Sequence, residues 1–253
     1  MFGICNLAII PLRLEHSDKS EIVSQVLFGE HFEIIEQFKQ WYRIKLHYDS
    51  YEGWIDSKQI QLISESDYNQ LSKDAIILNG DLIEYITSSS NFLLPIPLGS
   101  SLSFLNHAEI NSFNYNFEGT KISGIKSKKE LLNTAFMYLH APYLWGGKTP
   151  FGIDCSGFTQ MVYKLNGYKL DRDASQQALQ GEALSFIEES EPGDLAFFDN
   201  EEGNIIHVGI IMKDNYIIHA SGKVRVDRLD HLGIYNPELN KHTHKLRVIK
   251  KII

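Results

Sequence analysis

The sequence has few of the residues that mark several large classes of protein. Only two of its 253 residues are cysteine, too few for a disulfide scaffold in a chain of this length. No C-x-x-C or H-E-x-x-H spacing occurs, so no metal site is indicated. The net charge of −8 and the lack of a lysine/arginine block argue against a nucleic-acid-binding protein.

The amino-terminal segment gives little sign of export. Residues 1–10 (MFGICNLAII) are apolar but have no positive charge before the apolar run, which is short for a signal peptide and far too short to span a membrane. We interpret the segment as a first strand of a cytoplasmic protein that binds no membrane. The alternative is an exported protein whose signal peptide has been trimmed away.

The first half of the chain has the pattern of small all-β domains. Residues 1–64 contain short runs rich in Ile, Val, Phe, Tyr and Trp between turns, which predicts a small barrel. The predicted strands are 6–12, 22–27, 31–38, 41–47 and 51–55. Residues 65–123 are predicted to hold a linker or short helix at 65–73 and a second β-rich unit. In that unit we expect a turn leading into a strand at 95–102 and a hairpin at 116–119.

The second half changes from a helical to a β-rich pattern. Ser127 followed by Glu130 is a capping-box signature, so we expect a helix that opens a domain at 124–253. Strand-like apolar runs follow from Pro192 onward. Helices first and antiparallel strands afterwards predict an α+β domain.

One cysteine lies where a helix is predicted to begin. Cys155 follows a glycine-rich segment and precedes TQMVYKL, whose apolar residues have helical spacing. Backbone N–H groups and the dipole at a helix start favour negative charge, so we expect a lowered thiol pKa. The alternative is a small buried side chain, the usual state of a free cysteine and the one we expect for Cys5.

Two histidines occur in strand-like runs after this cysteine. His207 opens the run HVGII, and His219 lies near the end of YIIHA. If the two strands are antiparallel neighbours joined at 213–215, the imidazoles approach each other across the pair. His207 would then accept the thiol proton and His219 would hold its ring, although a lone strand histidine is more often a core residue. The other eight histidines are interpreted as surface or core residues.

Motifs in both halves resemble known families. Those of residues 127–253 are similar to the NlpC family of papain-like cell-wall peptidases, and in chain order they are PYLWGG, FGIDCSGF, RDASQQ, PGDLAFF, HVGI and IHAS. LFGE, WYRI and EGWI in residues 1–64 resemble the bacterial SH3-like domain. The whole chain looks most like the YkfC-type γ-D-glutamyl-L-diamino acid endopeptidases. This resemblance implies an α+β fold, with a papain-like NlpC catalytic domain preceded by one or two small all-β SH3-like barrels.

The resemblance also implies the catalytic residues. Family members are cysteine peptidases that cleave the bond after γ-linked D-glutamate in peptidoglycan stem peptides. Cys155 is then the nucleophile, His207 the base and His219 the polar third member, with no metal or organic cofactor. Tyr143 and the Cys155 backbone N–H would donate to the oxyanion.

Further residues are implied in substrate binding. Asp154 and Ser156, on either side of the nucleophile, contact the dipeptide in relatives. Related sequences often have serine directly after the Arg-Asp pair, where this chain has Ala174. Either Ser175 supplies the hydroxyl or the Ala174 backbone makes the contact.

A free N-terminal amine on the substrate is also implied. By the resemblance, Glu21, Tyr51 and Asp173 would line a pocket for the amine of L-alanine. A cationic amine that loses water needs carboxylate partners, which is consistent with this set.

The preferred interpretation is therefore a monomeric recycling enzyme that cleaves free murein peptides beginning with L-Ala-γ-D-Glu. The alternatives are a hydrolase that remodels intact wall and a non-catalytic wall-peptide binding protein. The residues do not distinguish diaminopimelate from lysine as the diamino acid.

Overall fold

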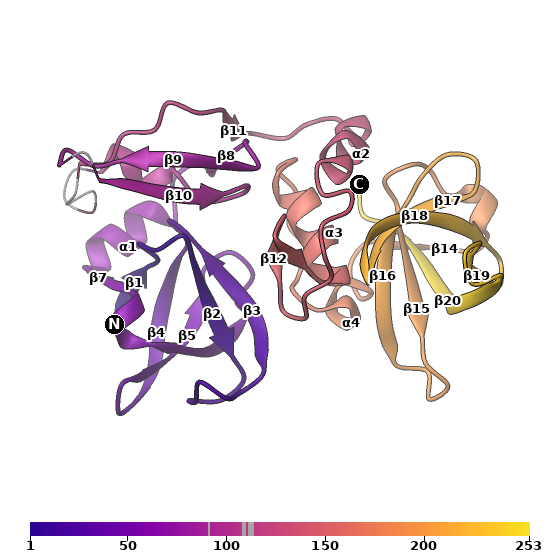
Figure 1. The fold of residues 1–253 in the computed structure, drawn as a ribbon, viewed down its shortest axis with the longest axis horizontal. Helices are drawn as coiled ribbons and strands as arrows, with labels where there is room; N and C mark the ends of the chain where they lie inside the picture. Colours follow the sequence, from indigo (N-terminus) through magenta and orange to yellow (C-terminus); the bar gives the residue numbers. More distant parts are fainter. Residues whose placement is uncertain (91, 108–109, 111–113) are drawn as a thin grey trace. The chain divides into compact units, whose positions relative to one another are not determined.

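The computed structural model describes residues 1–90, 92–107, 110 and 114–253. The chain separates into an amino-terminal unit, residues 1–124, and a carboxy-terminal unit, residues 125–253 (Figure 1). The finer division at residues 1–64, 65–123 and 124–253 stays a prediction. Within the described ranges, no helix is long and apolar enough to cross a membrane.

A seven-stranded antiparallel sheet builds the first part of the amino-terminal unit. Its order is β3-β2-β6-β5-β4-β1-β7. The strands are β1 (Phe2–Ile4), β2 (Ile9–Arg13), β3 (Ile22–Leu27), β4 (His31–Phe38), β5 (Trp41–Leu46), β6 (Glu52–Asp56) and β7 (Gln61–Ile63), with the short 3₁₀ helix η1 (Ser57–Gln59) before β7. Buried side chains of period two, including Leu12, Val26 and Ile44, form its core. Cys5 belongs to this core, as expected.

One predicted strand of this sheet was placed wrongly. The strand predicted at 6–12 begins only at Ile9, as β2, and a separate strand, β1, lies before the predicted run. The backbone between them pairs with the turn at residues 28–29 instead. Gly29 N–H donates to Cys5 O at 2.8 Å, and Phe28 N–H donates to Ala8 O at 3.2 Å. Pairing with this turn interrupts the strand.

The rest of the amino-terminal unit has two small sheets. Its elements are α1 (Glu65–Leu71), β8 (Ile77–Asn79), β9 (Ile83–Thr87), β10 (Leu93–Pro97), η2 (Ser103–Asn106) and β11 (Lys121–Ser123), with β9 paired to β10 and β8 to β11. The helix expected in 65–73 is confirmed, and Ser64 caps it by accepting from Asp67 N–H. Phe28 and Ile4 pack with Ile86 and Ile96 in one buried cluster, which joins these sheets to the first.

Two local predictions in this region were wrong. The strand expected after a turn in 95–102 instead precedes it, since β10 ends at Pro97. Residues 116–119 form no hairpin because Asn116 pairs with Thr87, and their N–H groups donate to each other's carbonyls at 2.7 and 2.9 Å. A long-range pairing has replaced the local turn.

The carboxy-terminal unit places helices before a curled antiparallel sheet. Its helices are α2 (Lys128–Phe136), α3 (Cys155–Lys164), α4 (Ala174–Gln177) and η3 (Ile187–Glu189). Its strands are β12 (Lys148–Thr149), β13 (Gly152–Ile153), β14 (Glu182–Leu184), β15 (Leu195–Asp199), β16 (Ile205–Ile211), β17 (Tyr216–Ser221), β18 (Lys223–Asp230), β19 (Gly233–Asn236) and β20 (Lys241–Lys251). The sheet order is β14-β20-β15-β16-β17-β18-β19, and pairing of β19 with β20 closes it on itself (Figure 1). This architecture confirms the expected α+β class.

The helix α2 begins where it was predicted, but its cap is different. Ser127 is the N-cap residue, yet its side chain makes no capping hydrogen bond. Only the backbone contact from Glu130 N–H to Ser127 O, at 2.9 Å, is present. The capping box predicted from Ser127 and Glu130 is therefore wrong.

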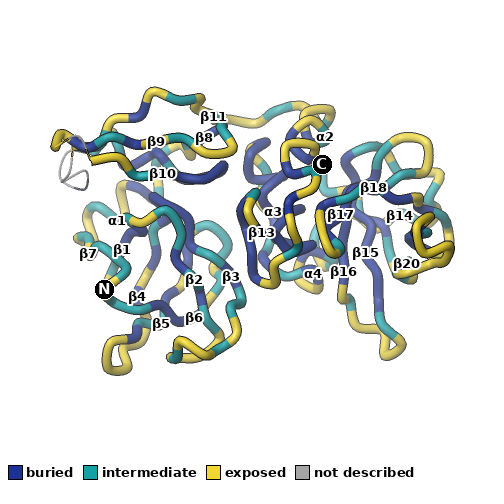
Figure 2. The backbone as a smooth tube through the Cα atoms, in the orientation of Figure 1, coloured by how far each residue is buried: buried dark blue, intermediate teal, exposed yellow. Residues whose placement is uncertain are grey.

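The helix α3 is buried along its whole length (Figure 2). Asp154 is its N-cap residue, and its Oδ1 accepts from Gly157 N–H at 2.6 Å. A Cβ atom added at Gly157 would lie 2.3 Å from Gly147 O, so the helix start approaches the glycine-rich segment too closely for any other residue. The sequence motif around Cys155 is thus required by packing as well as by chemistry.

A buried ion pair anchors the start of this helix. Arg172, only 1% exposed, donates through Nη1 and Nη2 to the two carboxylate oxygens of Asp154 at 3.1 and 2.6 Å. Arg172 Nη1 also donates to Ser156 Oγ at 3.0 Å. Gly146 N–H donates to Asp154 Oδ2 at 2.8 Å. The guanidinium therefore fixes the residues on both sides of Cys155.

Replacing Arg172 by leucine should destabilise the protein strongly. Removal of one partner leaves the buried Asp154 carboxylate uncompensated, at a cost of about 3–5 kcal/mol in the free energy of unfolding. Urea unfolding followed by far-UV circular dichroism measures it. Arg247→Leu is the matched control, because Arg247 is 62% exposed and only 3.7 Å from Asp199. Equal losses in the two variants would contradict the anchoring role.

Candidate active site

Cys155 is the first residue of α3, as predicted. Its side chain is buried, with the residue 7% exposed. Backbone hydrogen bonds from Val208 and Ser156 act on the sulfur. The Val208 contact places the thiol against β16, the strand that carries His207.

The thiol pKa differs from the prediction. Burial raises the pKa of Cys155 to about 12, and the neighbouring Asp154 carboxylate raises it further. The backbone N–H groups and Arg172 act in the opposite direction but are outweighed. The expectation of a lowered pKa was therefore wrong. Burial destabilises the thiolate more than the backbone N–H groups at the helix start stabilise it.

The two predicted histidines meet across neighbouring strands. β16 and β17 pair antiparallel, with Gly209 opposite His219. His207 Nε2 lies 2.8 Å from His219 Nδ1, in a buried hydrogen bond. A Cβ atom at Gly209 would lie 2.8 Å from the His219 Cβ, so glycine leaves the space that this diagonal contact crosses.

The second nitrogen of His219 is bonded to a residue that the sequence analysis missed. His219 Nε2 lies 3.0 Å from Asp227 Oδ2, on β18. Arg225 contacts the same carboxylate, with Nη2 donating to Oδ1 at 3.0 Å and Nε 2.7 Å from Oδ2. The sequence held a weak signal that Asp227 is buried. It lies two residues before the buried Leu229 and therefore on the same face of the strand.

His244 was also missed. Its ring stacks on His207, with centroids 4.1 Å apart and planes 25° apart. Burial lowers the pKa of His244 to about 4, with a further lowering from His219. The sequence analysis interpreted His244 only as a surface or core residue, because its strand, β20, is far in sequence from the strands of His207 and His219.

Both histidines of the pair are held neutral by their surroundings. Burial is the main cause that lowers the pKa of His207 well below its usual value, and His219 and His244 add to it. Burial also lowers the pKa of His219, although Asp227 partly opposes this. Burial therefore favours the neutral forms of the Cys155 thiol and of both imidazoles.

Three candidate substrate-binding residues surround the thiol. Tyr143 is half-buried, and burial followed by the nearby Cys155 and Asp154 raises its pKa. The side chains of Asp154 and Ser156 are buried and bonded to Arg172. Arg172 was not singled out by the sequence analysis, although it lies in the RDASQQ motif.

The other candidates lie further along the chain. Asp173 is the N-cap residue of α4, which packs against β16. Ala174 is buried and Ser175 is exposed. Glu21 is exposed before β3, and the half-buried Tyr51 packs on the first core of the amino-terminal unit. The amine pocket and the choice between Ala174 and Ser175 stay predictions.

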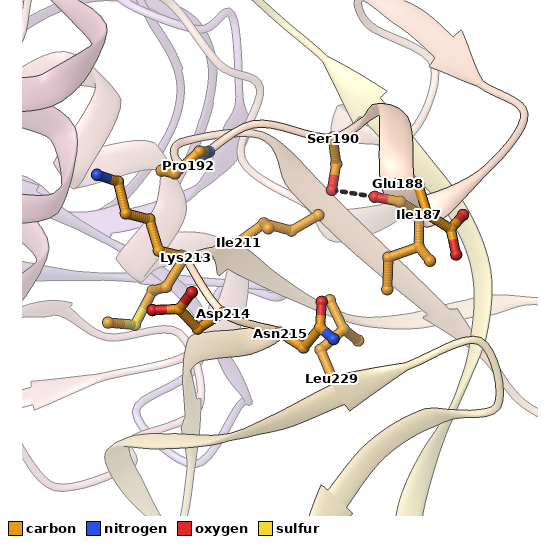
Figure 3. A pocket seen from close by; sticks show the side chains of 10 residues that line it. Ile187, Glu188, Ser190, Pro192, Ile211, Lys213, Asp214, Asn215 and Leu229 are labelled. Carbon is orange, nitrogen blue, oxygen red and sulfur yellow. Dashed lines mark hydrogen bonds between the residues drawn. The ribbon is translucent and has the colours of Figure 1, made fainter.

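The described residues contain no group of three or more His, Cys, Asp or Glu that could hold a metal ion. A cavity of about 260 Å³ lies at the far end of the β16–β17 hairpin from His207 (Figure 3). It is lined by Lys213, Asp214 and Asn215 of the hairpin turn together with Pro192 and Leu229, among others. None of the candidate site residues lines this cavity.

Comparison with known proteins agrees with this geometry. Residues 140–246 match the NlpC/P60 family, and residues 12–60 match the bacterial dipeptidyl-peptidase Sh3 domain. A protein of Bacillus subtilis named gamma-D-glutamyl-L-lysine dipeptidyl-peptidase is 30% identical over 218 residues, which are 79% of this chain and 72% of that protein. One of the same name from Bacillus cereus is 26% identical over 230 residues, 81% of this chain and 68% of that protein.

Solved structures show the same fold. An NlpC/P60 family protein from Bacillus cereus superimposes with a TM-score of 0.82 at 18% identity, covering 100% of this chain and 99% of that one. An NlpC/P60 endopeptidase from Photobacterium damselae gives a TM-score of 0.72 at 16% identity, covering 98% of this chain and 70% of that one. The chain belongs to the NlpC/P60 family and is a cysteine peptidase with an SH3-like domain before the papain-like one.

Proposed function

We propose that this peptidase hydrolyses the bond between γ-D-glutamate and an L-diamino acid in free murein peptides that begin with L-alanine. The observation that carries the proposal is the Cys155 thiol held beside Val208, next to the hydrogen-bonded His207 and His219. The substrate class is supported by relatives named gamma-D-glutamyl-L-lysine dipeptidyl-peptidase.

The proposed reaction is acyl transfer through a thioester. Cys155 Sγ attacks the γ-carbonyl carbon of D-glutamate while its proton passes to His207. His207 then gives this proton to the departing amine of the diamino acid. Water, deprotonated by His207, attacks the thioester, which releases L-Ala-γ-D-Glu and restores the thiol.

The resting pair is proposed to be neutral, so proton transfer accompanies attack. A buried thiolate–imidazolium pair would need solvation that this site does not offer. The reaction then resembles that of a serine–histidine pair, in which the base acts during the attack. Tyr143, beside the sulfur, is the proposed side-chain donor to the oxyanion, together with the Cys155 N–H.

Replacing Cys155 by alanine should abolish turnover without unfolding the protein. Loss of the nucleophile lowers kcat on the order of 10⁴-fold or more in hydrolases of this type. Release of L-Ala-γ-D-Glu from L-Ala-γ-D-Glu-L-Lys and from the diaminopimelate peptide, followed by mass spectrometry, measures it. Cys5→Ala removes the other thiol and should keep turnover. Full activity in Cys155→Ala would refute the mechanism.

Carboxylates proposed to bind the substrate amine predict a requirement for a free N-terminus. N-acetylation of L-alanine should raise KM or prevent cleavage, because a neutral amide does not pair with a carboxylate such as Glu21. Glu21→Gln should weaken cleavage of the free-amine peptide only. Comparison of kcat/KM for the two peptides in both proteins tests this. Equal cleavage of both peptides by the unaltered protein would instead favour remodelling of intact wall.

The raised thiol pKa predicts slow alkylation at neutral pH. Because the thiolate forms only as pH approaches about 12, the rate of Cys155 modification by iodoacetamide should rise about tenfold per pH unit from pH 6 to 10. Peptide mass spectrometry separates Cys155 from Cys5. A rate that is already constant between pH 6 and 8 would show a preformed thiolate–imidazolium pair.

A further inference from the structure

A buried carboxylate lies behind the two histidines. Asp227 is 2% exposed, and its Oδ2 is 3.0 Å from His219 Nε2. Arg225 contacts both carboxylate oxygens and extends outward to Glu238, with Nη1 donating to Oε2 at 3.1 Å. Burial alone would raise the pKa of Asp227, but hydrogen bonds from His219 and Arg225 hold it below its usual value. The group is therefore an anion near neutral pH.

An anionic carboxylate can only accept hydrogen bonds. His219 must then carry its proton on Nε2, which leaves Nδ1 of a neutral ring as an acceptor. His207 Nε2, 2.8 Å from that Nδ1, must be the donor in turn. The remaining nitrogen of His207, Nδ1, is left without a proton and is the one available to the Cys155 thiol.

We propose that Asp227 is a positioning residue that, through His219, fixes the Nε2–H tautomer of His207 so that Nδ1 is the free base. The site would then have four members, Cys155, His207, His219 and Asp227, with the imidazole of His219 transmitting the direction set by the carboxylate. The inference rests on the proposed function only in giving His207 the role of base.

The charged and titratable groups around this chain of hydrogen bonds come from three strands. His219 faces His207 on β16, Arg225 and Asp227 on β18, and His244 on β20, whose ring centroid is 5.8 Å from that of His219. Arg225 lowers the pKa of His219, whereas Asp227 raises it. Removal of the Asp227 charge should therefore move the pKa of the histidine pair downward.

Two substitutions at the same position separate the tautomer from the fold. In Asp227→Asn, the amide oxygen can take the place of Oδ2 and keep an acceptor for His219. In Asp227→Ala, no acceptor remains, so His219 can place its proton on Nδ1 and donate toward His207. Its partner would then hold a proton on Nδ1 and lose the ability to accept one from the thiol.

The decisive measurement is the nitrogen-15 NMR spectrum of the histidine side chains in the full chain. In the unaltered protein at pH 7.5, both His207 and His219 should show protonated Nε2 and bare Nδ1. The same pattern is expected in Asp227→Asn, and a mixture of tautomers in Asp227→Ala. An unchanged pattern in Asp227→Ala would overturn the proposal, and this readout needs no turnover.

Kinetics give the second readout. Asp227→Ala should lower kcat for L-Ala-γ-D-Glu-L-Lys on the order of 10²–10³-fold with little change in KM. Asp227→Asn should recover most of this loss, because its amide oxygen still accepts from His219. The acid limb of kcat/KM should move to lower pH in Asp227→Ala. Equal losses in both variants without a shift of this limb would show a purely structural role and overturn the proposal.

Asp230→Asn is the matched control, because this carboxylate lies on the same strand but pairs with the exposed His242. It should leave the tautomers, kcat and the pH profile unchanged. If the unaltered protein cleaves neither murein peptide, the proposed substrate is wrong. The NMR comparison of Asp227→Ala with Asp227→Asn still decides the role of Asp227.

Discussion

Loss of water is the physical constraint on which the rest of the site depends. Cys155, His207 and His219 all lie inside the carboxy-terminal unit, and burial is the largest cause of the pKa shift of each. Two buried carboxylates of the site are each bonded to a partner of opposite charge, Asp154 to Arg172 and Asp227 to Arg225. Burial therefore favours the neutral thiol and imidazoles of the site, and its charged side chains are paired.

The two ion pairs orient different groups of the site. Arg172 holds Asp154 and Ser156, and therefore the direction in which α3 presents Cys155. Arg225 holds Asp227, and therefore the end of the hydrogen-bond chain that passes through His219. Both carboxylates also bond to neutral groups of the site, so each ion pair couples a fixed charge to a group that must be oriented. Orientation, more than net stabilisation, is what buried pairs of this kind supply.

Much of this arrangement could be predicted from local sequence. The helix start at Cys155, the antiparallel pair of strands and the approach of His207 to His219 each depend on residues close together in the chain, and the structure has all three. Short runs rich in β-branched and aromatic residues between turns also predicted the strands at 22–27 and 31–38 at their observed limits. Short-range signals were enough because these elements are set by their own periodicity.

The features that could not be predicted depend on strand register and on closure of the sheet. His244 reaches His207 only because β20 returns to the middle of the sheet beside β15, and nothing in the residues around His244 specifies that place. The pKa of Cys155 was predicted in the wrong direction because a helix start is a local feature, whereas burial, the largest cause of the shift, is a consequence of packing. The hairpin expected at 116–119 failed for a similar reason, since Thr87 competes for Asn116.

The use of histidine as the third member has a consequence for the rest of the chain. An amide in that place has a fixed acceptor oxygen, and it needs no further residue to present that oxygen to the base. An imidazole can present either a donor or an acceptor on the same nitrogen, so its direction must be set from behind. Asp227, kept ionised by Arg225, meets that need, since a carboxylate offers acceptors only. A histidine as the third member therefore needs a fourth polar residue, and the neighbouring strand β18 supplies it, since β18 pairs with the strand that carries His219.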